Sequence, residues 1–263
     1  MEKARNPIFE PNKIVALVGY FFMTLIGSSI IISLIIIIYG SISTTISSEQ
    51  LWNLFTESDL SKLNPKYYHD YAMVSSLGNM LSYILMAAIV VFYLRNFLKE
   101  DAIKIKERWK HYIWLIPVCA GAFYGLSYLI DFLIGLAVQD TSVNQSSIEI
   151  SIRYGGGFAM FVAVVLMAPL VEELIYRKTI FKFLEKKPIV LSYIISILLF
   201  TIPHMLSTPV TDFGKWLLLC IPYAFSGTLL CGIYHVSGKN IYVSWFAHML
   251  NNLIAFILVA GGM

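Results

Sequence analysis

Residues 156–176 read GGFAMFVAVVLMAPLVEELIY, an apolar run interrupted near its end by two adjacent carboxylates, Glu172 and Glu173. A helix needs about 20 apolar residues to cross the hydrocarbon core of a bilayer, and this run has that length. A charged side chain at the centre of such a helix costs about 3 kcal/mol on insertion scales, so ionisable residues in membrane spans are rare and mark functional sites. The run therefore predicts a membrane-spanning helix that carries a polar site.

The rest of the chain has the same apolar character. Its 263 residues are 58% hydrophobic and only 13% charged, whereas about 25% of the residues of a soluble domain are charged. The sequence predicts an all-α fold, a polytopic transmembrane helical bundle of about seven spans. The candidate spans are residues 14–40, 72–94, 112–138, 156–176, 188–206, 214–236 and 240–260.

Lysine and arginine gather in alternate connections between these spans. They are frequent in the N-terminal segment and in 95–111 and 177–187, and sparse in 41–71 and 139–155. Because cytoplasmic loops carry the excess of basic residues, we expect a cytoplasmic N-terminus and an external C-terminus. The first apolar run is too long for a signal-peptide core and lacks a clear small-residue cleavage site, so we interpret it as an uncleaved span.

Other features of the sequence argue against several classes of protein function. A net charge of +3 without a basic aromatic patch gives no indication of nucleic-acid binding. Cys119, Cys220 and Cys231 lie in apolar runs without CxxC spacing, which predicts no disulfide framework and no cysteine metal site. The chain has no HExxH zinc helix, no GxSxG elbow, no GxxxxGK[ST] phosphate loop and no GxGxxG motif.

Two features outside the central motif have alternative interpretations. Residues 48–56 form either a short interfacial helix or a solvated loop with an aromatic anchor. Asp131 lies in the third predicted span without an obvious partner, and we place it near the outer interface rather than in a functional site.

The fourth predicted span holds the main chemical candidates. Glu173 and Arg177 are four residues apart, so they share a helix face and can neutralise one another. Glu172 points about 100° away and has no such partner within the motif. A carboxylate without a charged partner is available to accept a proton from water, as a general base must. For Glu173 and Arg177, a purely structural ion pair between helices remains the alternative.

Two histidines follow in later spans. The fifth span ends at Phe200–His204, where Pro203 frees a backbone carbonyl. If the chain reverses near Pro188, Glu172 and His204 each lie 16 residues from the turn, about 24 Å along their helices. Antiparallel packing would then bring them to one depth, where a glutamate and a histidine can hold one water and share its proton.

His248 and Asn252 form a second pair in the seventh span. They are four residues apart on one helix face, and Asn251 faces elsewhere. The pair can form hydrogen bonds to neighbouring helices. It can also donate to an oxyanion that develops during acyl transfer.

Three motifs thus occur in order on successive hydrophobic segments: Glu172-Glu173-x-x-x-Arg177, Phe200-x-x-x-His204 and His248-x-x-x-Asn252. In order and spacing they resemble the motifs of the CPBP family, the CAAX-prenyl-endopeptidase and bacteriocin-processing (Abi) intramembrane proteases. The resemblance covers about 155–255. We therefore divide the chain into an N-terminal membrane region with three spans, 1–154, and a catalytic core with four spans, 155–263.

The resemblance implies a helical bundle with a polar cavity inside the membrane that hydrolyses peptide bonds. It implies that Glu172 and His204 activate water, that His248 and Asn252 stabilise the oxyanion, and that Glu173 and Arg177 support them. A mechanism without a cofactor is our preferred interpretation. The alternative is a zinc metalloprotease, with ligands drawn from Glu172, His204 and His248.

The same resemblance sets expectations about partners and location. The substrate is expected to be a membrane-associated peptide or protein, such as a leader or pheromone precursor, and the enzyme a multi-pass protein of a bacterial cytoplasmic membrane. A hypothesis from another class is a non-proteolytic membrane protein, either a transporter or a bacteriocin self-immunity partner, that uses the carboxylates for proton transfer or binding.

Overall fold

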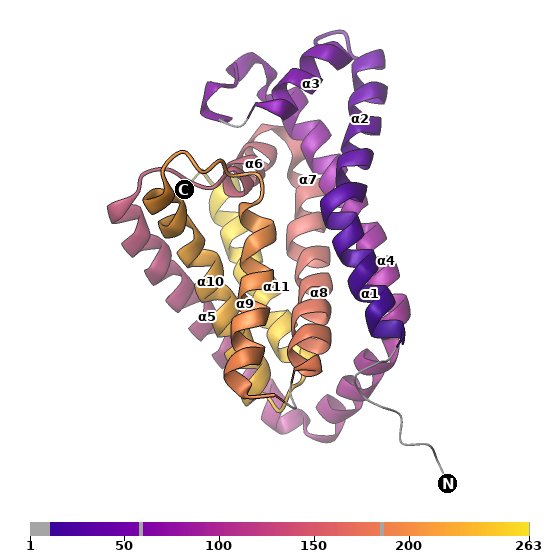
Figure 1. Cartoon of the computed structure of the whole chain (residues 1–263), viewed down its shortest axis with the longest axis vertical. Helices are drawn as coiled ribbons and strands as arrows, with labels where there is room; N and C mark the ends of the chain where they lie inside the picture. Colours follow the sequence, from indigo (N-terminus) through magenta and orange to yellow (C-terminus); the bar gives the residue numbers. More distant parts are fainter. Residues whose placement is uncertain (1–10, 58–59, 185–186, 263) are drawn as a thin grey trace.

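The computed structural model of the chain describes residues 11–57, 60–184 and 187–262. Over these residues the chain is helical without β-strands, and the helices pack along one another in a bundle (Figure 1). The prediction of an all-α polytopic bundle is confirmed. In chain order the α-helices are α1 (Pro11–Phe22), α2 (Ser28–Ile42), α3 (Ser48–Thr56), α4 (Tyr68–Glu107), α5 (Trp109–Ala137), α6 (Val143–Ser151), α7 (Gly157–Met160), α8 (Ala168–Glu173), α9 (Ile189–Met205), α10 (Phe213–Val236) and α11 (Ile241–Ala260).

The number of long spans differs from the sequence prediction by one. Within the described residues, six helical stretches are long and apolar enough to cross a membrane, and α9 is apolar but has only 17 residues. The fifth predicted span is therefore present as a helix but is shorter than the others, since it starts directly after Pro188 and ends soon after Pro203. The six long stretches are Pro11–Ile42, Pro65–Glu107, Trp109–Ala137, Val143–Phe181, Phe213–Val236 and Ile241–Ala260.

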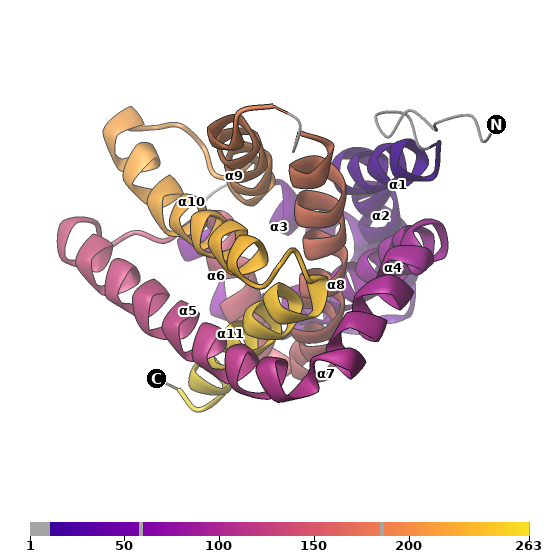
Figure 2. The ribbon, with the colours of Figure 1, turned by 90° about the horizontal axis from the view of Figure 1, so that it is seen from below.

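The helices run alternately up and down the bundle. The connections from α4 to α5, from the fourth long stretch to α9, and from α10 to α11 lie at the end where α1 begins (Figures 1 and 2). The basic residues of 95–111 and 177–187 gather in the first two of these connections and the helix ends beside them, and the third connection carries Lys239. By the positive-inside rule we take this end as the cytoplasmic end, and the opposite end as the outer end.

The segment 48–56, for which a helix and a loop were both possible, forms the helix α3 at the outer end of the bundle. Ser47 caps it by accepting a hydrogen bond from the Gln50 backbone, and the Gln50 side chain accepts one from the Ser47 backbone. This reciprocal pair satisfies free N–H groups at the helix start. Leu51 is fully buried beside Ile36 and Val74, whereas Trp52 is exposed. The segment is therefore a capped helix packed on the bundle.

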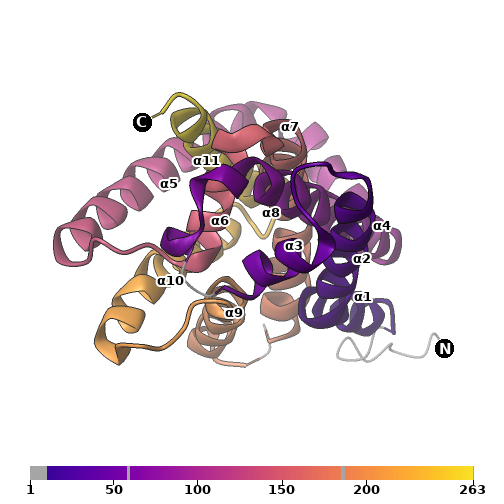
Figure 3. The ribbon, with the colours of Figure 1, turned by 90° about the horizontal axis from the view of Figure 1, so that it is seen from above.

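The fourth long stretch is irregular, and its irregularity positions the site. Tyr154 and Gly155 leave helical geometry, and Gly155 has a φ of 113°, which favours glycine. The polar helix α6 lies before this kink, at the outer end of the bundle (Figure 3). Beyond it, π-helical turns flank α8 at Phe161–Met167 and Leu174–Phe181. Pro169, which has no N–H to donate, begins the helix between them. Such widened turns are frequent at functional sites.

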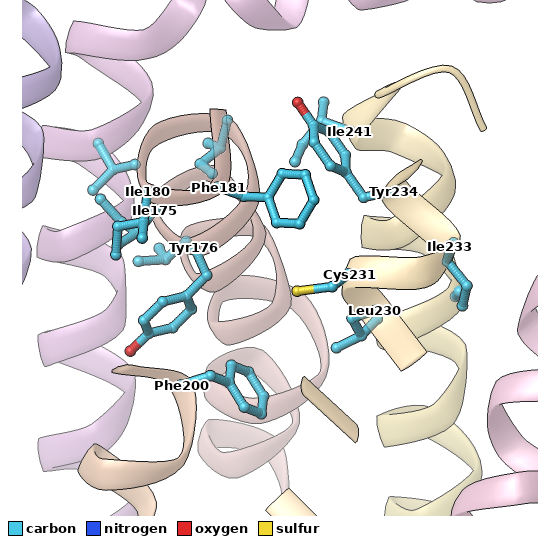
Figure 4. Packing of buried hydrophobic residues seen from close by; sticks show 14 of the residues in the cluster. Ile175, Tyr176, Ile180, Phe181, Phe200, Leu230, Cys231, Ile233, Tyr234 and Ile241 are labelled. Carbon is cyan, nitrogen blue, oxygen red and sulfur yellow. The ribbon is translucent and has the colours of Figure 1, made fainter. Parts of the chain in front are cut away.

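The hydrophobic core joins both halves of the chain. Figure 4 shows side chains of the π-helical segment after α8, such as Tyr176 and Phe181, meeting Phe200 of α9 and Cys231 of α10. Tyr20 of α1 reaches the same cluster, and its hydroxyl lies 2.7 Å from that of Tyr176. Because lipid tails are as apolar as these side chains, close van der Waals packing and interhelical hydrogen bonds, rather than removal of apolar surface from water, stabilise this contact.

A buried charged cluster ties three elements together near the cytoplasmic end. The fully buried carboxylate of Asp101 accepts hydrogen bonds from Lys178 Nζ (2.5 Å), Lys104 Nζ (2.8 Å) and the Ile241 backbone N–H (3.0 Å). These groups belong to α4, to the π-helical segment after α8 and to the first turn of α11. The cluster therefore fixes the α11 start relative to the segment that carries the paired glutamates.

Candidate active site

Glu173 and Arg177 form the ion pair that their spacing predicts. Both side chains are fully buried, and Arg177 Nη1 lies 3.2 Å from Glu173 Oε1. Arg177 Nη2 donates to the Gly227 carbonyl of α10 (3.3 Å), and the guanidinium lies over the Phe200 ring at 4.9 Å. The arginine thus contacts α9 and α10 as well as its own helix, so it fixes Glu173 within the bundle.

Glu172 points away from this pair and has a partner that sequence reasoning missed. The hydroxyl of Tyr83 in α4 donates to Glu172 Oε1 at 3.1 Å. The two residues are 89 positions apart, and no motif links them. The weak signal in the sequence was a tyrosine within an apolar span, since a buried phenol usually finds a hydrogen-bond partner.

His248 lies between the two carboxylates. Its Nδ1 is 3.4 Å from Glu173 Oε1, and its Nε2 is 4.0 Å from Glu172 Oε2. Because a carboxylate accepts hydrogen bonds, we place a proton on Nδ1, directed at Glu173. The other ring nitrogen is then the one that faces Glu172. The ring contacts Phe123 of α5 and Phe200 of α9 edge-on.

His204 is held in a defined orientation on α9. Its Nδ1 lies 2.7 Å from the Phe200 carbonyl oxygen. A carbonyl only accepts, so Nδ1 carries the proton and Nε2 of the neutral ring is available to accept one. The imidazole stacks on the Tyr223 ring of α10 with centroids 4.7 Å apart. Backbone and aromatic contacts therefore fix the tautomer and the plane of the ring.

A cavity of about 710 Å³ brings the predicted residues together. Glu172, His204, His248 and Asn252 all line this cavity. Glu172 and His204 form no hydrogen bond to each other through their side chains. Glu173 and Arg177 lie behind the wall rather than on it. Other lining side chains come from α1, α2, α4, α5 and α6 as well as from α8 to α11, so helices of the N-terminal region complete the cavity.

Asn252 and Asn251 both lie at the cavity, although only Asn252 was expected there. The Asn252 amide donates to the Val164 carbonyl (2.8 Å), and Asn251 donates to Asn252 Oδ1 (3.4 Å). Asn251 also lines the cavity, although the helix spacing places it on a different face. The cavity is wide enough to span both faces of α11 at this level. Asn252 keeps one amide hydrogen that has no protein acceptor among these contacts.

The three side chains considered as zinc ligands do not form a compact metal-binding cluster. Within 11–57, 60–184 and 187–262, no three histidine, cysteine, aspartate or glutamate side chains come close enough to hold a metal ion. His248 Nε2 lies 4.0 Å from Glu172 Oε2, and His204 lines the same cavity.

The fold and the cavity define the class: a multi-pass membrane protein with a buried carboxylate–histidine site between its spans. Residues 155–254 match the family described as Type II CAAX prenyl endopeptidase Rce1-like. The match covers all three motifs and confirms the resemblance that they indicate. At the level of the family, this part of the chain is similar to intramembrane proteases of the CAAX type.

Two relatives extend the similarity beyond the matched region. UPF0177 protein YvdC of Lactococcus lactis subsp. lactis is 23% identical over 247 residues, covering 92% of this chain and 87% of that protein. An uncharacterized protein of Mycoplasma capricolum subsp. capricolum is 23% identical over 198 residues, covering 70% of this chain and 56% of that protein. No solved structure matches the chain.

Proposed function

We propose that this protein is an intramembrane endopeptidase of a bacterial cytoplasmic membrane that hydrolyses a peptide bond in a membrane-associated peptide or protein. The observation that carries the proposal is the placement of Glu172, His204 and His248 around one cavity between the spans. The family match over 155–254 supports peptide-bond hydrolysis as the chemistry, and the organisms of the two relatives support a bacterial membrane.

The first step requires a water molecule between Glu172 and His204. In this step His204 acts through Nε2, because its Nδ1–H is used by the Phe200 carbonyl. Glu172 takes the proton as the water oxygen attacks the carbonyl carbon of the substrate. His204 orients the water by accepting its other hydrogen, and Tyr83 orients the carboxylate. General-base assistance of this kind contributes about 10²- to 10⁴-fold.

The attack forms a tetrahedral intermediate with negative charge on the former carbonyl oxygen. His248, held by Glu173 through Nδ1–H, donates to this oxygen from Nε2, which requires a proton on both ring nitrogens, and Asn252 donates its remaining amide hydrogen. Glu172 then returns its proton to the amide nitrogen, the C–N bond breaks and the new amine leaves. In this account Arg177 and Glu173 are positioning residues that act through His248.

The test compares cells that produce the wild-type protein with cells that produce Glu172→Gln. The amide has nearly the same shape but accepts no proton, so peptides released by this enzyme should be missing from the variant's membrane peptidome. Glu100→Gln, an exposed change in α4, is the matched control and should resemble the wild type. Identical peptidomes in wild-type and Glu172→Gln cells, at equal protein levels, would contradict the proposal and favour the non-proteolytic alternative.

A further inference from the structure

Asp131 is a charged residue of the third span that the chemistry above does not use. It lies in α5, has an exposed side chain, and lines the same cavity as Glu172 and His204. No hydrogen bond or ion pair joins it to another described residue. A lone carboxylate within a membrane span is costly, so such residues face water-filled cavities or take a cationic partner.

The cavity as a whole has an acidic wall. Three carboxylates line it, those of Asp131, Asp140 and Glu172, and no lysine or arginine is among its described lining residues. Asp140 already pairs with Lys215 at 3.3 Å on the exposed rim. Asp131 is therefore the carboxylate that is left for a cation from outside the chain, and the low-dielectric walls strengthen its field.

The position of Asp131 along α5 sets its distance from the proposed catalytic residues. The Phe123 ring of α5 contacts the His248 ring at 6.2 Å, which marks the level of those residues on this helix. Asp131 follows eight residues later, about 12 Å further toward the outer end at 1.5 Å per residue. An extended peptide advances about 3.3 Å per residue, so this separation corresponds to three or four residues of substrate.

The surroundings of Asp131 suit a long basic side chain. The apolar residues Ile134 of α5, Val138 directly after it and Leu219 of α10 also line the cavity. The helix α5 packs beside both α10 and α11 (Figure 2). Lysine and arginine bury aliphatic stems along apolar surface while their charged ends reach a polar group. A neutral polar side chain would leave the carboxylate without its countercharge.

We propose that Asp131 is a specificity-determining residue that binds a lysine or arginine of the substrate, three or four residues from the cleaved bond. This inference rests on the proposed endopeptidase function and names the class of substrate that it takes, a peptide with a basic residue at a fixed distance from the cleavage point. Asp131 binds substrate and takes no part in the proton transfers.

The test uses the purified full chain in detergent micelles and a defined peptide pool. The pool is a chymotryptic digest of bacterial membrane proteins, in which internal lysine and arginine are retained. New peptide ends are identified by mass spectrometry, and cleavage that persists in Glu172→Gln is subtracted. We expect lysine and arginine to be enriched at one position, three or four residues from the new ends.

Substitutions of Asp131 and of Asp140 test whether the negative charge of Asp131, rather than the shape of its side chain, selects the substrate. Asp131→Asn should lose the enrichment and raise KM about two- to fivefold for a selected lysine peptide, with kcat nearly unchanged, as expected for one partly screened ion pair. Asp131→Glu should keep the preference, and Asp131→Lys should replace it with a preference for aspartate or glutamate. Asp140→Asn, which alters the carboxylate on the exposed rim of the same cavity, should leave the preference intact.

The outcomes distinguish the two proposals. Cleavage without basic enrichment, or enrichment that survives Asp131→Asn, would overturn the assignment of Asp131 and leave the endopeptidase proposal standing. No cleavage by the wild type beyond that of Glu172→Gln would overturn the endopeptidase proposal, and the assignment of Asp131 with it.

Discussion

Tyr83 of α4 donates a hydrogen bond of 3.1 Å to Glu172, the proposed general base at the end of α8. The bond links the N-terminal region to the region that matches the protease family, which begins at residue 155. The first three spans therefore supply part of the site as well as its surroundings. Tyr83 orients one carboxylate oxygen, and the other oxygen faces His248.

The first prediction concerns this bond. Tyr83→Phe keeps the ring and removes the hydroxyl, so it should lower kcat about 10- to 100-fold, the range expected for one hydrogen bond to a charged group. KM and the thermal unfolding temperature should change little. Tyr93→Phe in the same helix, where the tyrosine makes no hydrogen bond to another described residue, is the control. Full activity in Tyr83→Phe would show that the bond has no role in catalysis.

The second prediction concerns the buried ion pair. Arg177→Ala leaves Glu173 as an unpaired buried carboxylate and should lower the free energy of unfolding by about 3–5 kcal/mol. Lys215→Ala removes an exposed pair with Asp140 and should cost at most about 1 kcal/mol. Chemical denaturation in detergent measures both. Equal stability losses in the two variants would mean that the burial of Arg177 does not matter energetically.

The third prediction concerns the oxyanion. His248→Ala should reduce kcat about 100- to 1,000-fold and leave KM nearly unchanged, because the donor acts only when charge develops. Asn252→Ala should act in the same direction but more weakly, and Asn251→Ala should be mild. Steady-state kinetics with one fluorogenic peptide compares the three variants. If His248→Ala mainly raises KM, His248 binds substrate and the oxyanion role is wrong.

The fourth prediction concerns metal. If Glu172 and His204 activate water without a metal ion, the purified protein should keep its activity after exhaustive chelation. Metal analysis and activity are measured on the same chelated sample. Stoichiometric zinc, with activity that is lost on its removal and restored on its return, would instead assign a Lewis-acid mechanism.

Local pattern predicted much of this molecule. Apolar runs of sufficient length gave the helices, and i, i+4 spacing gave the Glu173–Arg177 pair, because both depend on residues near one another in the chain. The chain reversal near Pro188 likewise brought Glu172 and His204 to one cavity.

Local sequence patterns could not predict the contacts between helices that are far apart in the chain. Tyr83 reaches Glu172, and His248 bridges two carboxylates, only because of how α4 and α11 pack on α8. Asp131 lies near the outer end of α5 and also lines the cavity, which its sequence position alone does not indicate. No local pattern indicates which face of α5 borders an internal space. The roles of the site residues stay predictions that kinetics must test.

The central claim is that Glu172 is the base of a peptide-bond hydrolysis. Its most direct test is single-turnover cleavage of one identified peptide by purified wild-type protein and by Glu172→Gln, with matched unfolding temperatures as proof of folding. The account predicts cleavage by the wild type and a rate about 10²- to 10⁴-fold lower in Glu172→Gln. Equal cleavage rates in the two folded proteins would contradict it.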